Sequence, residues 1–132
     1  LELKRLVDAI PDDVLNRPNS IGAWSGKDLL AHLANWEEEG IAIIERLDDG
    51  DPEQWPEKTN GSFDAWNEEH VAPWRARSLA EVNEYLQDAH FSLMDLAERS
   101  RNAKPEIVLP VTSEHYDKHL DDFRQLIPKE KR

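Results

Sequence analysis

Apolar residues recur at intervals of three or four positions along most of this chain, which is the spacing of one face of an α-helix. The clearest stripe lies in the segment 25–49, where Leu29, Leu33 and Trp36 begin a series of apolar residues at this interval. The only strand-like run, 107–109, is bracketed too tightly by prolines for a central strand. The pattern therefore predicts an all-α fold.

Capping residues and prolines mark where the helices begin and end. We expect loops at 51–61 and 102–110, and helices at the following places: 1–10, with its start upstream of Leu1 and its end at Pro11; 26–49, after a Ser25 cap and a capping-box Asp28; a short helix from Ser62 to Pro73; a longer one after the capping box 78–81; and 113–127, after a Thr112 cap. Four main helices with two long connections favour an up-and-down four-helix bundle. No repeat or change of composition divides the chain, so we expect a single domain over 1–132.

The chain is acidic and contains no cysteine. Its 132 residues include 28 Asp and Glu against 16 Lys and Arg, which gives a formal charge of -12. Because Lys and Arg provide most phosphate contacts, this balance argues against nucleic acid and an anionic membrane surface as partners. The lack of cysteine excludes disulfides, zinc–thiolate sites and a thiol nucleophile. No segment is apolar enough to span a bilayer, and we expect a cytoplasmic protein, although a first residue other than Met leaves a removed signal peptide open.

Three of the five histidines occupy positions that a helical bundle can bring together. His115 and His119 are i and i+4, one above the other on the last helix. His32 lies about two turns into the second helix, at the edge of its apolar stripe. Because these two helices run parallel in an up-and-down bundle, we expect the three imidazoles at one level. Three neutral His ligands with open positions are typical of a catalytic divalent metal.

Each histidine also has a simpler explanation when it is taken alone. His32 can be a core-edge residue bonded to a backbone carbonyl, and the pair 115 and 119 can be exposed on a helix surface. Only the joint pattern puts the metal interpretation level with the simpler one, and from the residues alone both stay open. For His70 and His90, which lie beside other apolar stripes, we expect structural roles.

Several other chemistries are excluded by spacing. Tyr116 stands where a zincin needs its Glu general base between two histidines, so a thermolysin-like protease is disfavoured. No Glu-x-x-His motif occurs, which argues against a ferritin-like di-iron site. No Gly-x-x-x-x-Gly-Lys phosphate loop and no Gly-x-Ser-x-Gly nucleophile elbow is present either.

The tryptophans and acidic pairs near the histidines allow two interpretations. Core packing is the default for Trp36 and Trp66, but Trp36 follows His32 by four residues and can form an apolar pocket wall beside a metal. We take Trp36, Trp66 and Asn67 as candidate pocket residues. The glutamates at 37–39 and 68–69 are expected on solvated helix faces, although those at 68–69 can also reach the site as a general base.

Three segments resemble one known superfamily. Residues 21–37, IGAWSGKDLLAHLANWE, resemble the G-x-W-S-x-K-D-x-L-A-H-L-x-x-W-E signature of the DinB/YfiT-like four-helix-bundle superfamily. Residues 115–120, HYDKHL, resemble its H-Y-x-x-H-L helix, and residues 63–67, FDAWN, its middle segment. The resemblance implies an up-and-down bundle of unusual hand. It also implies a divalent metal ion, Zn, Ni, Mn or Fe, on His32, His115 and His119.

The resemblance implies two functions of different kinds, a metal-dependent enzyme and a metal-free binding protein. Some members are similar to thiol S-transferases that act with glutathione, mycothiol or bacillithiol, and others are similar to maleylpyruvate isomerase. We therefore expect a metal-dependent enzyme, of hydrolase or thiol S-transferase type, that activates water or a small thiol toward a small-molecule substrate. No residue beyond the metal ligands is identified as catalytic.

The alternative is a metal-free bundle that sequesters a small apolar molecule in a Trp-lined cleft. The neighbouring ClbS/DfsB-like branch, which protects against genotoxic products and can lack the metal ligands, resembles this chain around Trp24, Ser25 and Trp36. A homodimer is compatible with either function, although no heptad seam identifies one.

Overall fold

The structure, a computed structural model, describes residues 2–129, and every regular element in that range is a helix. The elements are α1 (Glu2–Asp8), α2 (Asp12–Leu15), α3 (Gly26–Asp48), α4 (Asp64–Val71), the 3-10 helix η1 (Ala72–Trp74), α5 (Leu79–Arg99), α6 (Pro105–Val111) and α7 (Ser113–Arg124). The predicted all-α fold is confirmed. The part of the expected first helix that falls on Leu1 lies outside the described residues. Within them, no helix is long and apolar enough to cross a membrane.

The two long helices, α3 and α5, begin at the predicted capping boxes. The Ser25 hydroxyl accepts the backbone N–H of Asp28, and the Asp28 carboxylate accepts the N–H of Ser25, both at 3.0 Å. Ser78 and Glu81 form the same pair of bonds at the start of α5. Such caps satisfy N–H groups that have no partner inside the helix.

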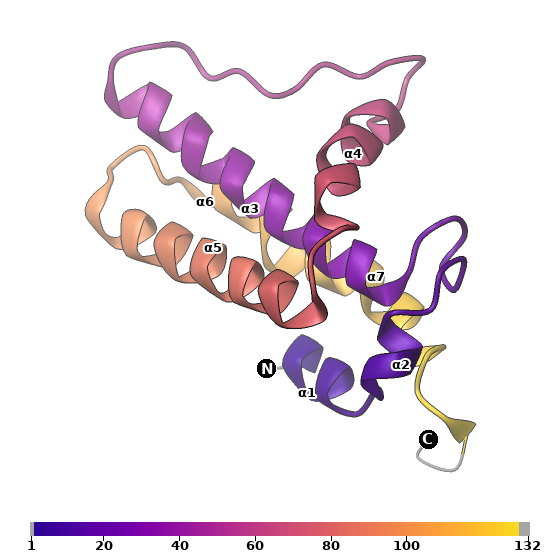
Figure 1. Ribbon diagram of the computed structural model, residues 1–132. Coiled ribbons are helices and arrows are strands. Elements are labelled where there is room, and N and C mark those ends of the chain that lie inside the picture. The colour runs from indigo at the N-terminus through magenta and orange to yellow at the C-terminus, as the bar shows by residue number, and fades with distance from the viewer. Residues whose placement is uncertain (1, 130–132) are drawn as a thin grey trace.

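The helix α3 lies at the centre of the fold, with α5 alongside it and α6 and α7 on another side (Figure 1). Its first half contributes to one apolar core with α1, α2, α5 and α7, in which Leu29, Leu33 and Phe123 are fully buried. Its second half packs against α5 and α6 through Ile43 and Ile44. Because α3 has neighbours around most of its circumference, polar residues on it are buried as well as apolar ones.

The directions of the two long helices, α3 and α5, differ from the expected up-and-down order. Near the start of α3, Lys27 donates to the carbonyl of Arg77, just before α5, at 2.7 Å. At the end of α3, Asp48 accepts from the hydroxyl of Ser100, just after α5, at 2.6 Å. The two long helices therefore run parallel. The chain makes this possible by returning through the loop 49–63 and α4 before α5 begins (Figure 1).

The segment 102–110, which we predicted as a loop, contains the helix α6. Pro105 lies in its first turn, where the missing N–H of proline would have no helical partner in any case. The predicted Thr112 cap is also wrong, because the Thr112 hydroxyl donates back to the carbonyl of Val108 at 2.7 Å. The last helix, α7, then ends at Arg124 and not at 127.

Smaller differences lie near the other ends. The four-residue α2 after Pro11 was not predicted. The short helix α4 begins at Asp64, with the Ser62 hydroxyl 3.4 Å from its first backbone N–H. The predicted stop at Pro73 is confirmed as a change from α4 to η1.

Candidate metal centre

The imidazoles of His32, on α3, and of His115 and His119, on α7, meet between the two helices. The Nε2 atoms of His32 and His115 are 2.9 Å apart. One ring nitrogen from each of the three residues lies within 4.8 Å of the other two. The structure therefore brings together all three residues that the sequence singled out as metal ligands.

The reason for this meeting differs from the expected one. Gly26, at the start of α3, lies against Leu126, beyond the end of α7, whereas Gly40 lies against Val111, at the end of α6. The helices α6 and α7 therefore run antiparallel to α3, and the expectation of parallel helices is wrong. The imidazoles still meet because α6 precedes α7, so that the helical stretch begins at Pro105 and ends at Arg124. His115 and His119 lie in the second half of this stretch. The second half of an antiparallel partner faces the start of α3.

Burial keeps two of the rings neutral. The side chain of His32 is buried, with 4% of the residue exposed. Desolvation, followed by repulsion from His115 and His119, lowers the pKa of His32 to about 2. Desolvation and then His119 lower the pKa of His115 to about 3. At neutral pH both rings therefore keep a lone pair that can bind a metal ion.

The hydrogen bonding of these two rings is incomplete within the described chain. The Nδ1 atoms of His32 and His115 are both buried, and neither has a hydrogen-bond partner among the described residues. The contact between the two Nε2 atoms uses one proton at most, so a direct imidazole pair leaves one donor and one acceptor unsatisfied. The observation that points to a bound cation is the Nε2 contact itself, because a cation between the two Nε2 atoms would accept both lone pairs and leave each proton on an Nδ1 atom.

The third ring is oriented by a carboxylate. The Nδ1–H of His119 donates to Oδ2 of Asp122 at 2.9 Å, which leaves Nε2 of His119 with the lone pair. A carboxylate behind an imidazole is the usual second partner of a metal-binding histidine. Asp122 was not predicted from the sequence, where its signal is a position three residues after His119 on the same helical face.

This donor set fits a divalent ion of the first transition series. Three imidazole nitrogens suit Zn, Ni, Mn or Fe, and three protein ligands leave a position for another ligand. The Nε2 atoms of His32 and His115 are 2.9 Å apart, and one nitrogen of each ring lies within 4.8 Å of the other two, so the three rings are close enough to share one ion.

An indole packs beside His32. The ring centroids of Trp24 and His32 are 5.1 Å apart. Its Nε1–H donates to Glu68 at 3.0 Å, and Arg75 binds the same carboxylate with two N–H groups. Hydrogen bonds from Arg75 and then from Trp24 lower the pKa of Glu68 to about 2, which is far too low for a general base near neutrality. Glu68 and Glu69 are exposed, as expected.

The three candidate pocket residues also lie together. Trp36 packs on Trp66 with ring centroids 4.3 Å apart, and its Nε1–H donates to Oδ1 of Asn67 at 2.8 Å. The Trp36 ring lies 6.5 Å from that of His115. A hollow of about 310 Å³ borders this cluster and is lined by Glu39, Arg46, Gln54, Trp55, Pro56, Glu57 and Trp66. Two packed indoles therefore lie next to each other, Trp36 near His115 and Trp66 in the lining of the hollow.

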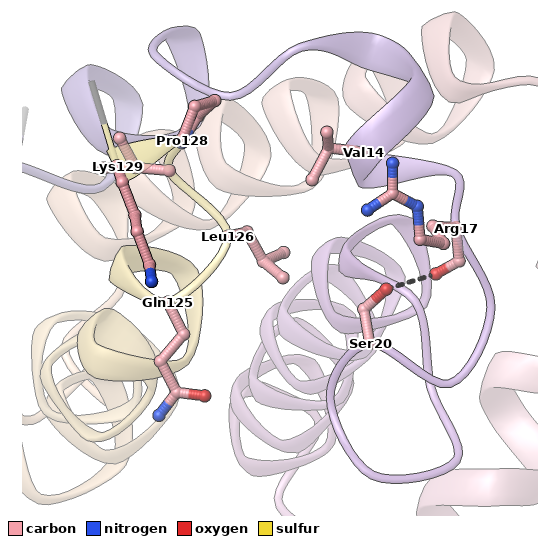
Figure 2. A pocket seen from close by; sticks show the side chains of 8 residues that line it. Val14, Arg17, Ser20, Gln125, Leu126, Pro128 and Lys129 are labelled. Atoms are coloured by element: carbon pink, nitrogen blue, oxygen red, sulfur yellow. Dashed lines mark hydrogen bonds between the residues drawn. The ribbon is translucent and has the colours of Figure 1, made fainter. Parts of the chain in front are cut away.

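A second hollow, of about 360 Å³, is lined by residues of α2, of the segment after it and of the segment after α7 (Figure 2). Val14 and Arg17 line one side of it, and Leu126 and Lys129 line the other. Ser20 donates to the carbonyl of Arg17 at its edge. No histidine borders this hollow, and it has no part in the site.

The expectation of a solvated Glu37 is wrong. Its side chain is fully buried, because α5 and α7 cover the face of α3 on which it lies. It accepts hydrogen bonds from His90 and Tyr116, and burial raises its pKa. His90 has the structural role expected of it, and the exposed His70 donates to the carbonyl of Trp66 at 2.8 Å.

Comparison with known proteins identifies the family. The family model described as the mycothiol maleylpyruvate isomerase N-terminal domain matches residues 2–118. The match includes His32 and His115 and ends one residue before His119. No curated protein and no solved structure matches the chain. Since the match spans most of the 132 residues, the chain belongs to the mycothiol maleylpyruvate isomerase N-terminal domain family, within the DinB/YfiT-like superfamily.

Proposed function

We propose that this chain is a metal-dependent enzyme in which His32, His115 and His119 hold one divalent ion and activate a small thiol or water toward a small molecule. The convergence of three imidazoles, two of which bring their Nε2 atoms to 2.9 Å from each other, carries this proposal. Membership of a family that often binds metal supports it.

The chain contains no cysteine, so a thiol nucleophile would have to come from outside it. When bound, a divalent ion supplies Lewis acidity and lowers the pKa of a coordinated thiol or water toward neutrality. The description of the family names mycothiol, which is a thiol, and this supports a thiol co-substrate.

The protein residues would hold the ligands and shape the approach. Asp122 keeps His119 in the tautomer that leaves Nε2 free to bind. Trp24 packs beside His32 and limits the access of water from that side. Trp36, Trp66 and Asn67 form a rigid wall beside His115 against which an apolar part of a substrate can pack.

The test is the ionisation of a small thiol on the metal-loaded protein. Mycothiol, and glutathione in parallel, would be titrated with pH at stoichiometric zinc-loaded protein, and thiolate would be followed by its ultraviolet absorbance. We expect the apparent thiol pKa to fall by about one unit or more with the wild type. The matched control is His70→Ala, which removes an exposed histidine and should give the same shift. His119→Ala should give none.

Hydrolysis of p-nitrophenyl acetate tests the water alternative with the same variants. A zinc-dependent rate that His119→Ala abolishes would favour hydrolase chemistry. If neither the thiol pKa nor the ester hydrolysis responds to the ion, the enzyme proposal is wrong.

A further inference from the structure

Glu37 is the most unusual side chain in the described core. It lies in the middle of α3 with 0% of its surface exposed. A carboxylate in such a place is tolerated only when hydrogen-bond donors surround it. The metal site does not use it, and nothing in the apolar packing of α3 requires an acid at this position.

Two donors from two different helices reach Glu37. The hydroxyl of Tyr116, on α7, donates to Oε2 at 2.7 Å, and the Nδ1–H of His90, on α5, donates to Oε1 at 2.6 Å. His90 Nδ1 is also 3.0 Å from the Tyr116 oxygen. One carboxylate therefore joins α3 to both of its neighbours.

The bond to Tyr116 connects the two helices that carry the imidazoles. Tyr116 directly follows His115 and precedes His119 by three residues, whereas Glu37 follows His32 by five. Helices are stiff over one or two turns, so a bond at Tyr116 fixes both the rotation of α7 and its position along α3. Apolar contacts have no direction and specify such a register less sharply than a buried hydrogen bond.

We propose that Glu37 and Tyr116 are positioning residues, whose hydrogen bond sets the register of α7 on α3 and thereby holds the rings of His32 and His115 at ligand distance. His90 supports them by satisfying the second carboxylate oxygen. The consequence for metal affinity rests on the function proposed above, whereas the consequence for the ring contact does not.

The test compares two tyrosines that make the same kind of bond to α3. Tyr116→Phe removes only the hydroxyl that binds Glu37, and His90 remains to satisfy the carboxylate. Tyr85→Phe is the matched control, because its hydroxyl donates to Oδ1 of Asn35, also on α3, at 2.7 Å. Tyr85 lies on α5, however, which carries no proposed ligand.

Zinc affinity and the visible spectrum of the cobalt-substituted protein give the first measurement. Tyr116→Phe should raise the zinc Kd roughly tenfold and change the cobalt absorption bands, while Tyr85→Phe should stay within about twofold of wild type with unchanged bands. Equal effects of the two substitutions, or no effect of Tyr116→Phe, would overturn the proposal.

A metal-free measurement separates this proposal from the metal function. Nuclear Overhauser contacts between the rings of His32 and His115 should be present in the wild type and in Tyr85→Phe, and weakened in Tyr116→Phe. If the wild type binds no zinc, the metal function fails, and these contacts still decide whether Glu37 and Tyr116 set the register. Unchanged contacts in Tyr116→Phe would reject that role.

Glu37→Gln provides a conservative second variant. Its amide oxygen can accept the same Tyr116 hydroxyl, so the ring contacts and the zinc Kd should stay within about threefold of wild type. A loss as large as that of Tyr116→Phe would show that the buried charge matters and not the bond to Tyr116, and the proposal would then be wrong.

Discussion

The Nδ1–H of His119 donates to Oδ2 of Asp122 at 2.9 Å, from one turn of α7 to the next. This bond selects the tautomer of His119 and restrains the rotation of its ring. Removing the carboxylate with Asp122→Ala should weaken zinc binding by about 10–100-fold, the usual effect of losing the partner behind a metal-binding histidine. Competition with a fluorescent zinc chelator measures the change.

The neighbouring Asp121 offers a matched control for this prediction. Its side chain is 86% exposed and pairs with Arg124. Asp121→Ala removes the same charge from the same helix and should change the zinc Kd by no more than about twofold. Wild-type affinity in Asp122→Ala would contradict the orienting role of Asp122.

The neutral imidazoles make the metal-free protein sensitive to acid. The pKa is held at about 2 for His32 and about 3 for His115 in the folded state, against about 6.5 for an unfolded chain. Below pH 6.5 the unfolded state therefore binds more protons. The free energy of unfolding should fall as the pH falls, by roughly 1.4 kcal/mol per pH unit for each histidine.

Urea denaturation of the metal-free protein between about pH 7 and pH 5 measures this slope. His32→Gln should reduce it by about half. The raised pKa of Glu37 acts in the opposite direction, since its protonation favours the folded state, but it is common to the wild type and the variant. An unchanged slope in His32→Gln would be inconsistent with a neutral buried ring.

Gly40 allows α6 to approach α3. A Cβ atom at this position would lie 2.9 Å from Cγ2 of Val111, a buried and rotationally stiff side chain. Gly40→Ala should therefore destabilise the protein by about 1–3 kcal/mol, although alanine alone favours a helix by about 1 kcal/mol. Urea denaturation measures the difference. Adding Val111→Ala should cancel part of the clash, and a more stable Gly40→Ala would show that the contact is loose.

The cap of α3 should contribute to stability because it fixes the start of the helix that carries His32. Ser25→Ala removes the oxygen that accepts the N–H of Asp28 and should cost about 0.5–2 kcal/mol. Ser62→Ala is the comparison, since the hydroxyl of Ser62 lies 3.4 Å from the N–H of Asp64 and is the weaker acceptor. Thermal or urea unfolding should rank Ser25→Ala as the more damaging substitution, and the reverse order would refute this role of the cap.

Caps, prolines and apolar stripes predicted a helix correctly where these signals agreed with one another. The serine caps at 25 and 78 and the apolar stripes behind them fix α3 and α5 closely. The helix α6 was missed because Pro105 and Pro110 suggest a loop, although proline fits the first turn of a helix. Without α6, His115 and His119 fall near the start of the last helix and not in the second half of the segment. The direction of that helix was also wrong, and the two errors cancelled, so the prediction that the three histidines meet was correct for a partly wrong reason.

The hydrogen-bond partners of the residues around the site depend on contacts between helices, which a helical wheel does not show. A wheel assigns one buried face to a helix, whereas α3 is covered on several sides, and this placed Glu37 wrongly in solvent. The bonds of Tyr116 to Glu37 and of Trp24 to Glu68 join residues 79 and 44 positions apart. Such pairs follow from the register of packed helices, which the periodicity of a single helix does not determine.

The most direct test of the metal centre is elemental mass spectrometry of protein purified without an affinity tag or added metal. We predict close to one equivalent of a transition metal in the wild type and in His70→Ala, and its loss in His32→Ala and His119→Ala. A wild-type protein that contains no transition metal and takes up none from zinc, nickel or manganese would contradict this prediction.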